Sequence, residues 1–331
     1  MIELSCAFAT SLATPDHVAL AEQLGYRRAW LYDSPALYPD VWAMLALCAE
    51  RTSRIAIGPA VLVPSLRHPI TNAAAIATLV ALAPGRVEVA IGSGFTGRMT
   101  LGKRPLSWKY VRHYVEALQG LLRGEEVTWD GGVIQMMHPE GFAPARPIRV
   151  PMLLGAGGPK GEAAAAELAD GMFVAGGVPP AAASRAGRCA VLTFGTVLEA
   201  GEDAGSARAI NAAGHAGAVA LHAMYERGSS VAGLPGGADW TADLEAIPAA
   251  RRHLALHDLH LIGLTERDAR IVTGELLEQF GAARSAEGWA SRLAELEAQG
   301  ATEIAYQPAG DDIPGELRRF AAAAAAATTS G

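Results

Sequence analysis

Residues 54–95 read RIAIGPAVLVPSLRHPITNAAAIATLVALAPGRVEVAIGSGF, and this stretch decides the fold. A β-branched strand at 54–63 is followed by a loop, an alanine-rich helix that ends at Pro84-Gly85, and a second strand at 86–92. Neither strand holds a polar residue in its interior except Glu88, so both faces of each strand are expected to be covered, as a parallel sheet requires. The stretch therefore predicts a βαβ unit of an α/β protein, with its chemistry at the carboxyl ends of the strands.

The rest of the chain repeats this pattern of apolar, β-branched segments that end at Gly or Pro. Eight strands are predicted, at 2–9, 28–32, 54–63, 86–92, 150–155, 171–175, 189–197 and 302–306. Eight parallel strands predict a TIM (β/α)8 barrel that forms a single domain over residues 1–331. Helices fit between most of the strands, including one capped by Thr14-Pro15-Asp16, one capped by Asp40, one at 107–123 and one at 162–169.

The segment 198–300 is too long for a single crossover between the seventh and eighth strands. We therefore expect a helical insertion there, together with the last barrel helix, and an exposed loop around 228–248 where Gly, Ala and Pro accumulate.

Composition and charge narrow the class of protein. The 331 residues carry a formal net charge of −7 without a basic run longer than two arginines, so nucleic acid is not an expected partner. The chain shows neither a secretion signal nor an apolar run long enough to span a membrane. Cys6, Cys48 and Cys189 lie far apart in apolar surroundings, which indicates buried, reduced thiols. A cytoplasmic enzyme that acts on a small molecule, away from membranes, is expected.

Two glycine pairs follow predicted strands. Residues 155–159 read GAGGP and precede a helix, so backbone N–H groups and the positive helix end converge where no side chain blocks an anion. Gly157 and Gly158 are the predicted phosphate-binding residues, and Gly176 and Gly177 could form the opposite wall. The alternative is that each pair only turns a strand into a helix.

Two further motifs resemble binding sites, one for a dinucleotide and one for a metal, but neither is accepted as such a site. Gly92-x-Gly94-x-x-Gly97 satisfies the dinucleotide-binding fingerprint, but residues 98–105 look like a loop, so no helix is expected directly behind it and the fingerprint is set aside. His253, His257 and His260 are spaced i, i+4 and i+7 along a predicted helix. Without the carboxylate of a His-Glu-x-x-His motif, a packed or substrate-facing helix is favoured over a metal site, and no metal is expected.

The order of these motifs resembles the bacterial luciferase-like family, and within it the branch that depends on a deazaflavin, coenzyme F420, typified by methylenetetrahydromethanopterin reductase. The resemblance is dense in the first half to two-thirds of the chain and slight over 198–260. The matching segments are LYDS at 31–34, ERTSRIAIG at 50–58, RHP at 67–69, ATL at 77–79, GR at 85–86, IGSG at 91–94, GEEV at 124–127, GGPK at 157–160 and ADG at 169–171.

The resemblance implies a flavin-type ring in the barrel mouth and assigns residues around it. A bulge with a non-prolyl cis peptide between Ala60 and Val61 would press on the ring, while Ser93 and Gly94 would border it. Asp33 and Ser34 match a polar pair beside the deazaflavin, where Asp33 could bind the ring or its chain and Ser34 could orient the substrate or donate a proton. Residues implied for the cofactor site are Asp33, Ala60, Val61, Ser93, Gly94, Gly157, Gly158, Gly176 and Gly177.

The implied activity is hydride transfer between coenzyme F420 (8-hydroxy-5-deazaflavin) and a small organic substrate, by a reductase or dehydrogenase that forms a homodimer. Asp33, Ser34 and His68 are the candidate catalytic residues, and Trp108 and His113 the candidate substrate residues. Related reductases often carry an acid just after the Gly-x-Gly turn, where this chain has Phe95-Thr96. An FMN-dependent luciferase-like monooxygenase is the alternative in the same fold, and a non-catalytic flavin-binding barrel is the alternative of another class.

Overall fold

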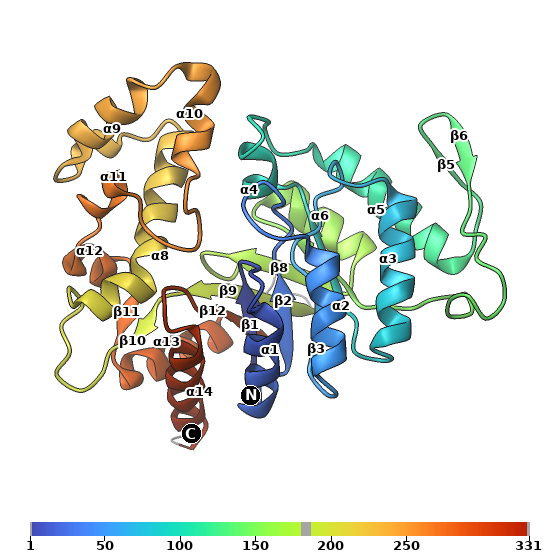
Figure 1. Ribbon diagram of the computed structural model, residues 1–331, viewed down its shortest axis with the longest axis horizontal. Coiled ribbons are helices and arrows are strands. Elements are labelled where there is room, and N and C mark those ends of the chain that lie inside the picture. Colours follow the sequence, from blue (N-terminus) through green and yellow to red (C-terminus); the bar gives the residue numbers. More distant parts are fainter. Residues whose placement is uncertain (1, 180–186, 330–331) are drawn as a thin grey trace.

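The computed structural model describes residues 2–179 and 187–329, and eight parallel strands form its centre (Figure 1). Their order is β3-β2-β1-β12-β9-β8-β7-β4, and two isolated parallel bridges, Ile57 to Val87 and Leu62 to Ile91, bring the two ends of this sheet together. The predicted (β/α)8 barrel is confirmed, and each strand overlaps its predicted range. The barrel strands are β1 (Glu3–Phe8), β2 (Arg28–Leu31), β3 (Ala56–Pro59), β4 (Val89–Gly92), β7 (Met152–Gly155), β8 (Gly171–Ala175), β9 (Arg188–Phe194) and β12 (Glu303–Gln307).

Helices cover the outside of the barrel. Asp40 caps α2 as expected, because its carboxylate accepts hydrogen bonds from the N–H groups of Trp42 and Ala43. The prediction that Thr14-Pro15-Asp16 caps α1 is wrong, since the N-cap is Ala13 and Thr14 already lies in the helix. The helices around the barrel are α1 (Thr14–Gln23), α2 (Val41–Arg51), α3 (Pro69–Leu82), α4 (Phe95–Met99), α5 (Trp108–Arg123), α6 (Pro159–Leu168), α13 (Ala286–Ala298) and α14 (Ile313–Thr329).

Small side chains line much of the barrel interior. Two large side chains also lie there, Trp30 and Phe173, which pack edge-on against each other. At the amino-terminal ends of the strands the interior becomes charged. Glu88, the one polar residue noted in the strand pattern, pairs with Arg28 at 2.9 Å and with Arg188 at 2.7 Å. These ion pairs satisfy a partly buried acid that the sequence alone leaves without a partner.

The segment between β9 and β12 holds the predicted helical insertion, which lies beside the barrel in Figure 1. It has an apolar core of its own, centred on Trp240 and Leu244. Most of the stretch 228–248 is exposed as expected, but the loop assignment is wrong, because the stretch contains a 3-10 turn and α9, on which Trp240 is buried. The elements of the insertion are β10 (Thr196–Val197), α8 (Ala207–Glu226), η1 (Val231–Gly233), α9 (Gly237–Glu245), α10 (Ala249–Leu256), α11 (Glu266–Ala269), α12 (Gly274–Gln279) and β11 (Ala283–Arg284).

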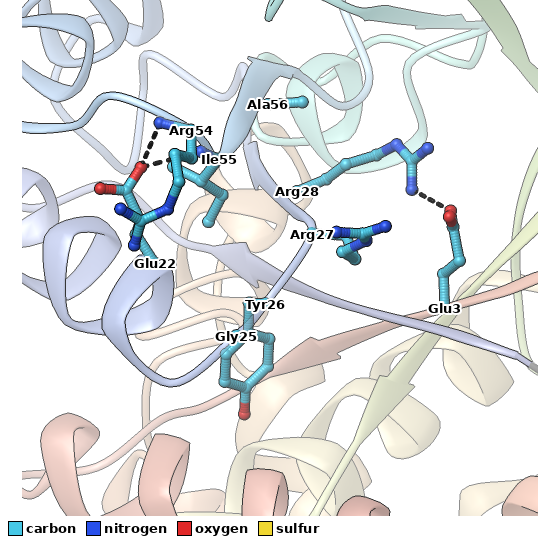
Figure 2. A pocket seen from close by; sticks show the side chains of 9 residues that line it. All are labelled: Glu3, Glu22, Gly25, Tyr26, Arg27, Arg28, Arg54, Ile55 and Ala56. Atoms are coloured by element: carbon cyan, nitrogen blue, oxygen red, sulfur yellow. Dashed lines mark hydrogen bonds and ion pairs between the residues drawn. The ribbon is translucent and has the colours of Figure 1, made fainter.

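A pocket of about 320 Å³ lies at the amino-terminal ends of β1, β2 and β3, where Figure 2 shows Arg28 next to Glu3 and Glu22 bonded to the backbone of Arg54 and Ile55. Because the active sites of (β/α)8 barrels lie at the opposite end of the strands, we assign no chemistry to this pocket.

Cys6, Cys48 and Cys189 are buried free thiols, as expected. Among the described residues, no helix is both long and apolar enough to cross a membrane. A small hairpin, β5 (Val127–Trp129) with β6 (Gly132–Ile134), extends beyond α5 (Figure 1).

Candidate functional site

The carboxyl ends of β7 and β8 form an open half of the barrel mouth. After β7 the chain passes through Gly157 to Gly158, which is the N-cap of α6 and is followed by Pro159 at the first helical position. A Cβ atom placed on either glycine would meet no atom of the described residues within 4 Å, and the same holds at Gly176 and Gly177 after β8. Backbone groups at the positive end of a helix thus border space that no side chain of residues 2–179 or 187–329 fills, which fits the anionic tail of a cofactor.

Val61 lies across the floor of this open half. The peptide bond between Ala60 and Val61 is cis, as the resemblance predicted. A Cβ on Gly92 would come within 2.7 Å of the Val61 side chain, and one on Gly155 within 2.9 Å of it. The side chain can occupy this place only because both neighbouring strands end in glycine. The structure therefore brings Val61 together with the ends of β4 and β7.

Asp33 is held in an ion-pair network rather than left free. Its Oδ1 accepts a hydrogen bond from Arg67 Nη1 at 2.7 Å, and Arg67 Nη2 bonds Asp40 Oδ2 at 2.6 Å. Burial raises the pKa of the Asp33 carboxyl, and the Arg67 guanidinium opposes that shift. The neighbouring Ser34 is also buried, and a Cβ on Gly97 of α4 would lie 3.6 Å from its Oγ. Both residues lie at the mouth, but Asp33 already has a partner.

The other predicted catalytic and substrate residues lie in the layer of helices. His68 Nδ1 accepts a hydrogen bond from the N–H of Ile70 at 3.3 Å and so caps α3. Its ring lies edge-on to Trp129, with 6.1 Å between the ring centroids, and His113 stacks on the same indole at 4.8 Å. Trp108 packs against Gly161 at the start of α6. The structure thus brings His68 and His113 together at Trp129, and their roles toward a substrate stay predictions.

The expectation that no helix begins directly behind the Gly92-x-Gly94 turn is wrong. Gly94 adopts a left-handed conformation with φ of 82° and is the N-cap of α4, which is 5 residues long. The residues 98–105 that looked like a loop therefore overlap the end of a short helix. On α4, Thr96 Oγ1 lies 3.2 Å from His260 Nε2, a contact that joins this turn to the insertion.

The ends of β1, β2 and β12 form a covered half of the mouth. The hydroxyl of Tyr38 donates to the carbonyl oxygen of His260, and Gln307 Nε2 donates to the carbonyl oxygen of Leu261 at 2.5 Å. Leu261 is only 8% exposed and joins the apolar cluster of the barrel interior. Residues 257–263 of the insertion thus close this half of the mouth.

The predicted histidine face does not exist, because α10 ends at Leu256 before His257 and His260. These two residues instead meet His222 of α8. Sequence reasoning missed His222, although a signal was present: His215, His222 and Glu226 recur at intervals of seven and four along one helix.

Comparison with known proteins places the chain in a family. The 5,10-methylenetetrahydromethanopterin reductase of Archaeoglobus fulgidus is 32% identical over 48% of this chain and 47% of that protein. The F420-dependent glucose-6-phosphate dehydrogenase of Microbacterium testaceum is 30% identical over 50% of this chain and 53% of that protein. The chain thus spans about half the length of the curated relatives it matches.

The likeness in fold extends over the whole chain. The coenzyme F420 dependent tetrahydromethanopterin reductase from Methanopyrus kandleri superposes with a TM-score of 0.65 at 18% identity, over 97% of both chains. A family model described as luciferase-like monooxygenase matches residues 12–303. Since that match covers most of the chain, the protein belongs to the luciferase-like monooxygenase family.

Proposed function

We propose that this chain is an oxidoreductase that uses coenzyme F420 to transfer a hydride to or from a small organic substrate. The observation that carries the proposal is the open half of the barrel mouth, where bare glycine turns at the start of α6 border open space. The curated relatives support the choice of cofactor, since they include a dehydrogenase named as F420-dependent. When bound, the deazaflavin supplies a carbon that carries the hydride.

The residues of the chain have separate tasks in this proposal. Gly157 and Gly158 bind the anionic tail through backbone groups, with Gly176 and Gly177 as the opposite wall. Ala60 and Val61 set the position of the ring from one side, and Ser93 and Gly94 border it. This arrangement orients the substrate and keeps water away from the reacting carbon.

Asp33 and Ser34 complete the site. The bond to Arg67 fixes the carboxylate of Asp33, so Asp33 orients the ring or its chain instead of exchanging a proton. Ser34, buried beside Gly97, is the proton donor in this proposal. His68 keeps a proposed place at the rim together with Trp108 and His113, which would contact the substrate.

Ligand binding tests the proposal. Purified protein is titrated with coenzyme F420 and, separately, with FMN, and the quenching of ligand fluorescence is measured. We expect a dissociation constant in the micromolar range or below for F420 and at least about tenfold weaker binding of FMN. Equal or tighter binding of FMN would overturn the proposal in favour of the monooxygenase alternative.

Turnover separates an enzyme from a non-catalytic barrel. Protein that binds F420 is mixed with reduced or oxidised coenzyme and a panel of carbonyl compounds, alkenes and alcohols, and the absorbance of the coenzyme is followed. We expect a change with at least one substrate, which Ser34→Ala should slow without weakening coenzyme binding. A Ser34→Ala variant that keeps full turnover would remove Ser34 from the mechanism.

Assembly and location are part of the proposal. We propose a homodimer in the cytoplasm, with the interface on α2 and α3, where the exposed apolar residues include Leu47 and Leu82. Light scattering that gives the mass of one chain would overturn the dimer.

A further inference from the structure

Three histidines from separate parts of the insertion meet in its interior. His222 lies on α8, His257 follows the last residue of α10, and His260 lies in the next turn. All three are buried, with exposed fractions of 1%, 1% and 3%. His260 Nδ1 lies 3.2 Å from His222 Nδ1 and 3.4 Å from His257 Nδ1. One ring nitrogen from each residue therefore points to a common centre.

The remaining ring nitrogens already have partners. His257 Nε2 lies 2.8 Å from Glu226 Oε1, and His222 Nε2 lies 3.4 Å from Asp268 Oδ2. Because a carboxylate only accepts, these two Nε2 atoms carry the protons, which in neutral rings leaves the Nδ1 atoms of His222 and His257 as lone pairs.

The ring of His260 cannot donate a hydrogen bond to the Nδ1 atoms of both His222 and His257. Its Nδ1 can carry at most one hydrogen, which can be directed to only one of the two neighbouring nitrogens. If instead His260 Nε2 donates to Thr96 Oγ1, which lies 3.2 Å away, three lone pairs face one another. Either way a buried nitrogen lacks a donor, a costly arrangement that a bound cation would relieve.

The spacing of the nitrogens fits a transition metal. Zn²⁺ binds imidazole nitrogen at about 2.0–2.1 Å in tetrahedral geometry, which separates neighbouring ligands by about 3.3–3.4 Å. The ligand atoms of His222, His257 and His260 all lie within 4.8 Å of one another, and two of the separations are 3.2 and 3.4 Å. Metal-bound histidines commonly donate their other N–H to a carboxylate, as His222 and His257 do here.

We propose that His222, His257 and His260 bind a divalent transition-metal ion of the Zn²⁺ class through their Nδ1 atoms, with Glu226 and Asp268 as carboxylates of the outer shell. The two carboxylates offset the charge of the ion in a buried setting. Asp268 is itself fixed by Trp240 Nε1 at 2.8 Å and by Thr265 Oγ1 at 2.7 Å.

The proposed metal site joins α8 to the covered half of the mouth. His260 is linked through its ring to Thr96 of α4 and through its carbonyl oxygen to Tyr38, and the next residue, Leu261, bonds Gln307 of β12. An ion bound by His222 and His260 would therefore fasten residues 257–263 over the ends of β1, β2 and β12.

Cobalt substitution tests the site directly. Protein without an affinity tag is stripped with EDTA, dialysed and titrated with Co²⁺, and the visible absorption of the metal is recorded. We expect a spectrum of tetrahedral Co²⁺ that saturates at one ion per chain and that Zn²⁺ abolishes by displacement. Elemental analysis after dialysis against Zn²⁺ should give one zinc per chain, and Zn²⁺, unlike Mg²⁺, should raise the Tm.

Variants locate the ion. His257→Gln should abolish the Co²⁺ spectrum, whereas Glu226→Gln, which changes only an outer carboxylate, should weaken binding by about 10–100-fold. His253→Gln is the matched control, because His253 lies on α10 four residues before His257 and outside the cluster. It should bind Co²⁺ as the unaltered protein does.

Several results would overturn the proposal. Folded, tag-free protein that takes up no zinc and gives no Co²⁺ spectrum would show that the three rings share protons instead. Equal loss of binding in His253→Gln and Glu226→Gln would place the ion elsewhere. Should His257→Gln fail to fold, the stoichiometry of the unaltered protein and the Glu226→Gln affinity decide. None of these measurements depends on coenzyme F420, so the metal site and the proposed function fail separately.

Discussion

The two halves of the barrel mouth differ in what occupies them. Around Gly157 and Gly176 the strands end in turns without side chains, and a Cβ atom there would meet open space. Around Tyr38 and Gln307 the same end of the barrel is closed by residues 257–263 of the insertion. The difference teaches that one long insertion can restrict a ligand to the half of a symmetric barrel where backbone, not side chain, forms the wall.

Filling the open half should have the largest effect on the binding of the coenzyme. Gly157→Glu places a carboxylate where we expect the anionic tail of the coenzyme, and the new Cβ would meet no atom of the described residues within 4 Å. Binding of coenzyme F420, measured by fluorescence quenching, should weaken at least about 100-fold through charge repulsion and lost space. Gly233→Glu is the control, since a Cβ there also meets nothing within 4 Å. If Gly157→Glu binds as tightly as Gly233→Glu, the open half is not the phosphate site.

Breaking the ion pair at Asp33 should have the largest effect on the stability of the fold. The side chain of Asp33 is 1% exposed, so Arg67→Met leaves a buried carboxylate without its cation. We expect the free energy of unfolding, from urea titration, to fall by about 3–5 kcal/mol at pH 7. Burial already raises the pKa of Asp33, so protonation should relieve the penalty and the loss should shrink as the pH falls.

Asp40→Asn is the control for this ion pair. Asp40 is 51% exposed and asparagine can still cap α2, so the loss should stay within about 1 kcal/mol. Equal losses for Arg67→Met and Asp40→Asn would mean that the carboxylate of Asp33 is hydrated and that this part of the mouth is open.

The insertion should show a smaller effect that depends on pH. His215 of α8 is buried, and burial lowers its pKa to about 4 against the opposing effect of a backbone hydrogen bond at Ala212. Above pH 6.5 the His215 ring is neutral in both the folded and the unfolded chain, so it does not change the free energy of unfolding. Below pH 6.5 His215 takes up a proton in the unfolded chain but not in the folded chain. The free energy of unfolding therefore falls by about 1.4 kcal/mol per pH unit until about pH 4.

His215→Leu should remove that dependence. With both proteins in EDTA, the free energy of unfolding of the variant minus that of the unaltered protein should increase by about 2 kcal/mol from pH 6.5 to pH 5. Only the unaltered chain has this histidine to protonate on unfolding. Urea titrations at the two pH values give the difference. If the free energies of unfolding of the two proteins change with pH in the same way, water reaches the His215 ring and the interior of the insertion is loosely packed.

Much of the barrel could be predicted because its signals are local. Strand 54–63 and the glycine turn at 155–159 each carry their pattern within a few residues, and both occur where expected. The error at 228–248 has a local cause too: Gly and Pro accumulate there, but burial of Trp240 favours a helix that composition does not indicate. The cis peptide at Ala60 was predicted by resemblance alone and not by any local pattern.

The candidate site was predicted less completely. The glycines of the open half are recognisable because a missing side chain is a property of the sequence itself. His68 was named as a candidate catalytic residue; its ring caps α3 and contacts Trp129, and its role toward a substrate stays a prediction. Which way a side chain points after a strand depends on neighbours that the strand pattern does not specify.

By itself the sequence determined the eight strands, the glycine turns at the carboxyl ends of β7 and β8, and the place of the insertion, since each depends on residues close together in the chain. Only the tertiary structure decided which half of the mouth stays open and which histidines meet. His222 and His260 are 38 residues apart, and Arg67 reaches Asp33 across 34. Contacts over such distances depend on how whole elements pack, and local periodicity carries no record of that packing.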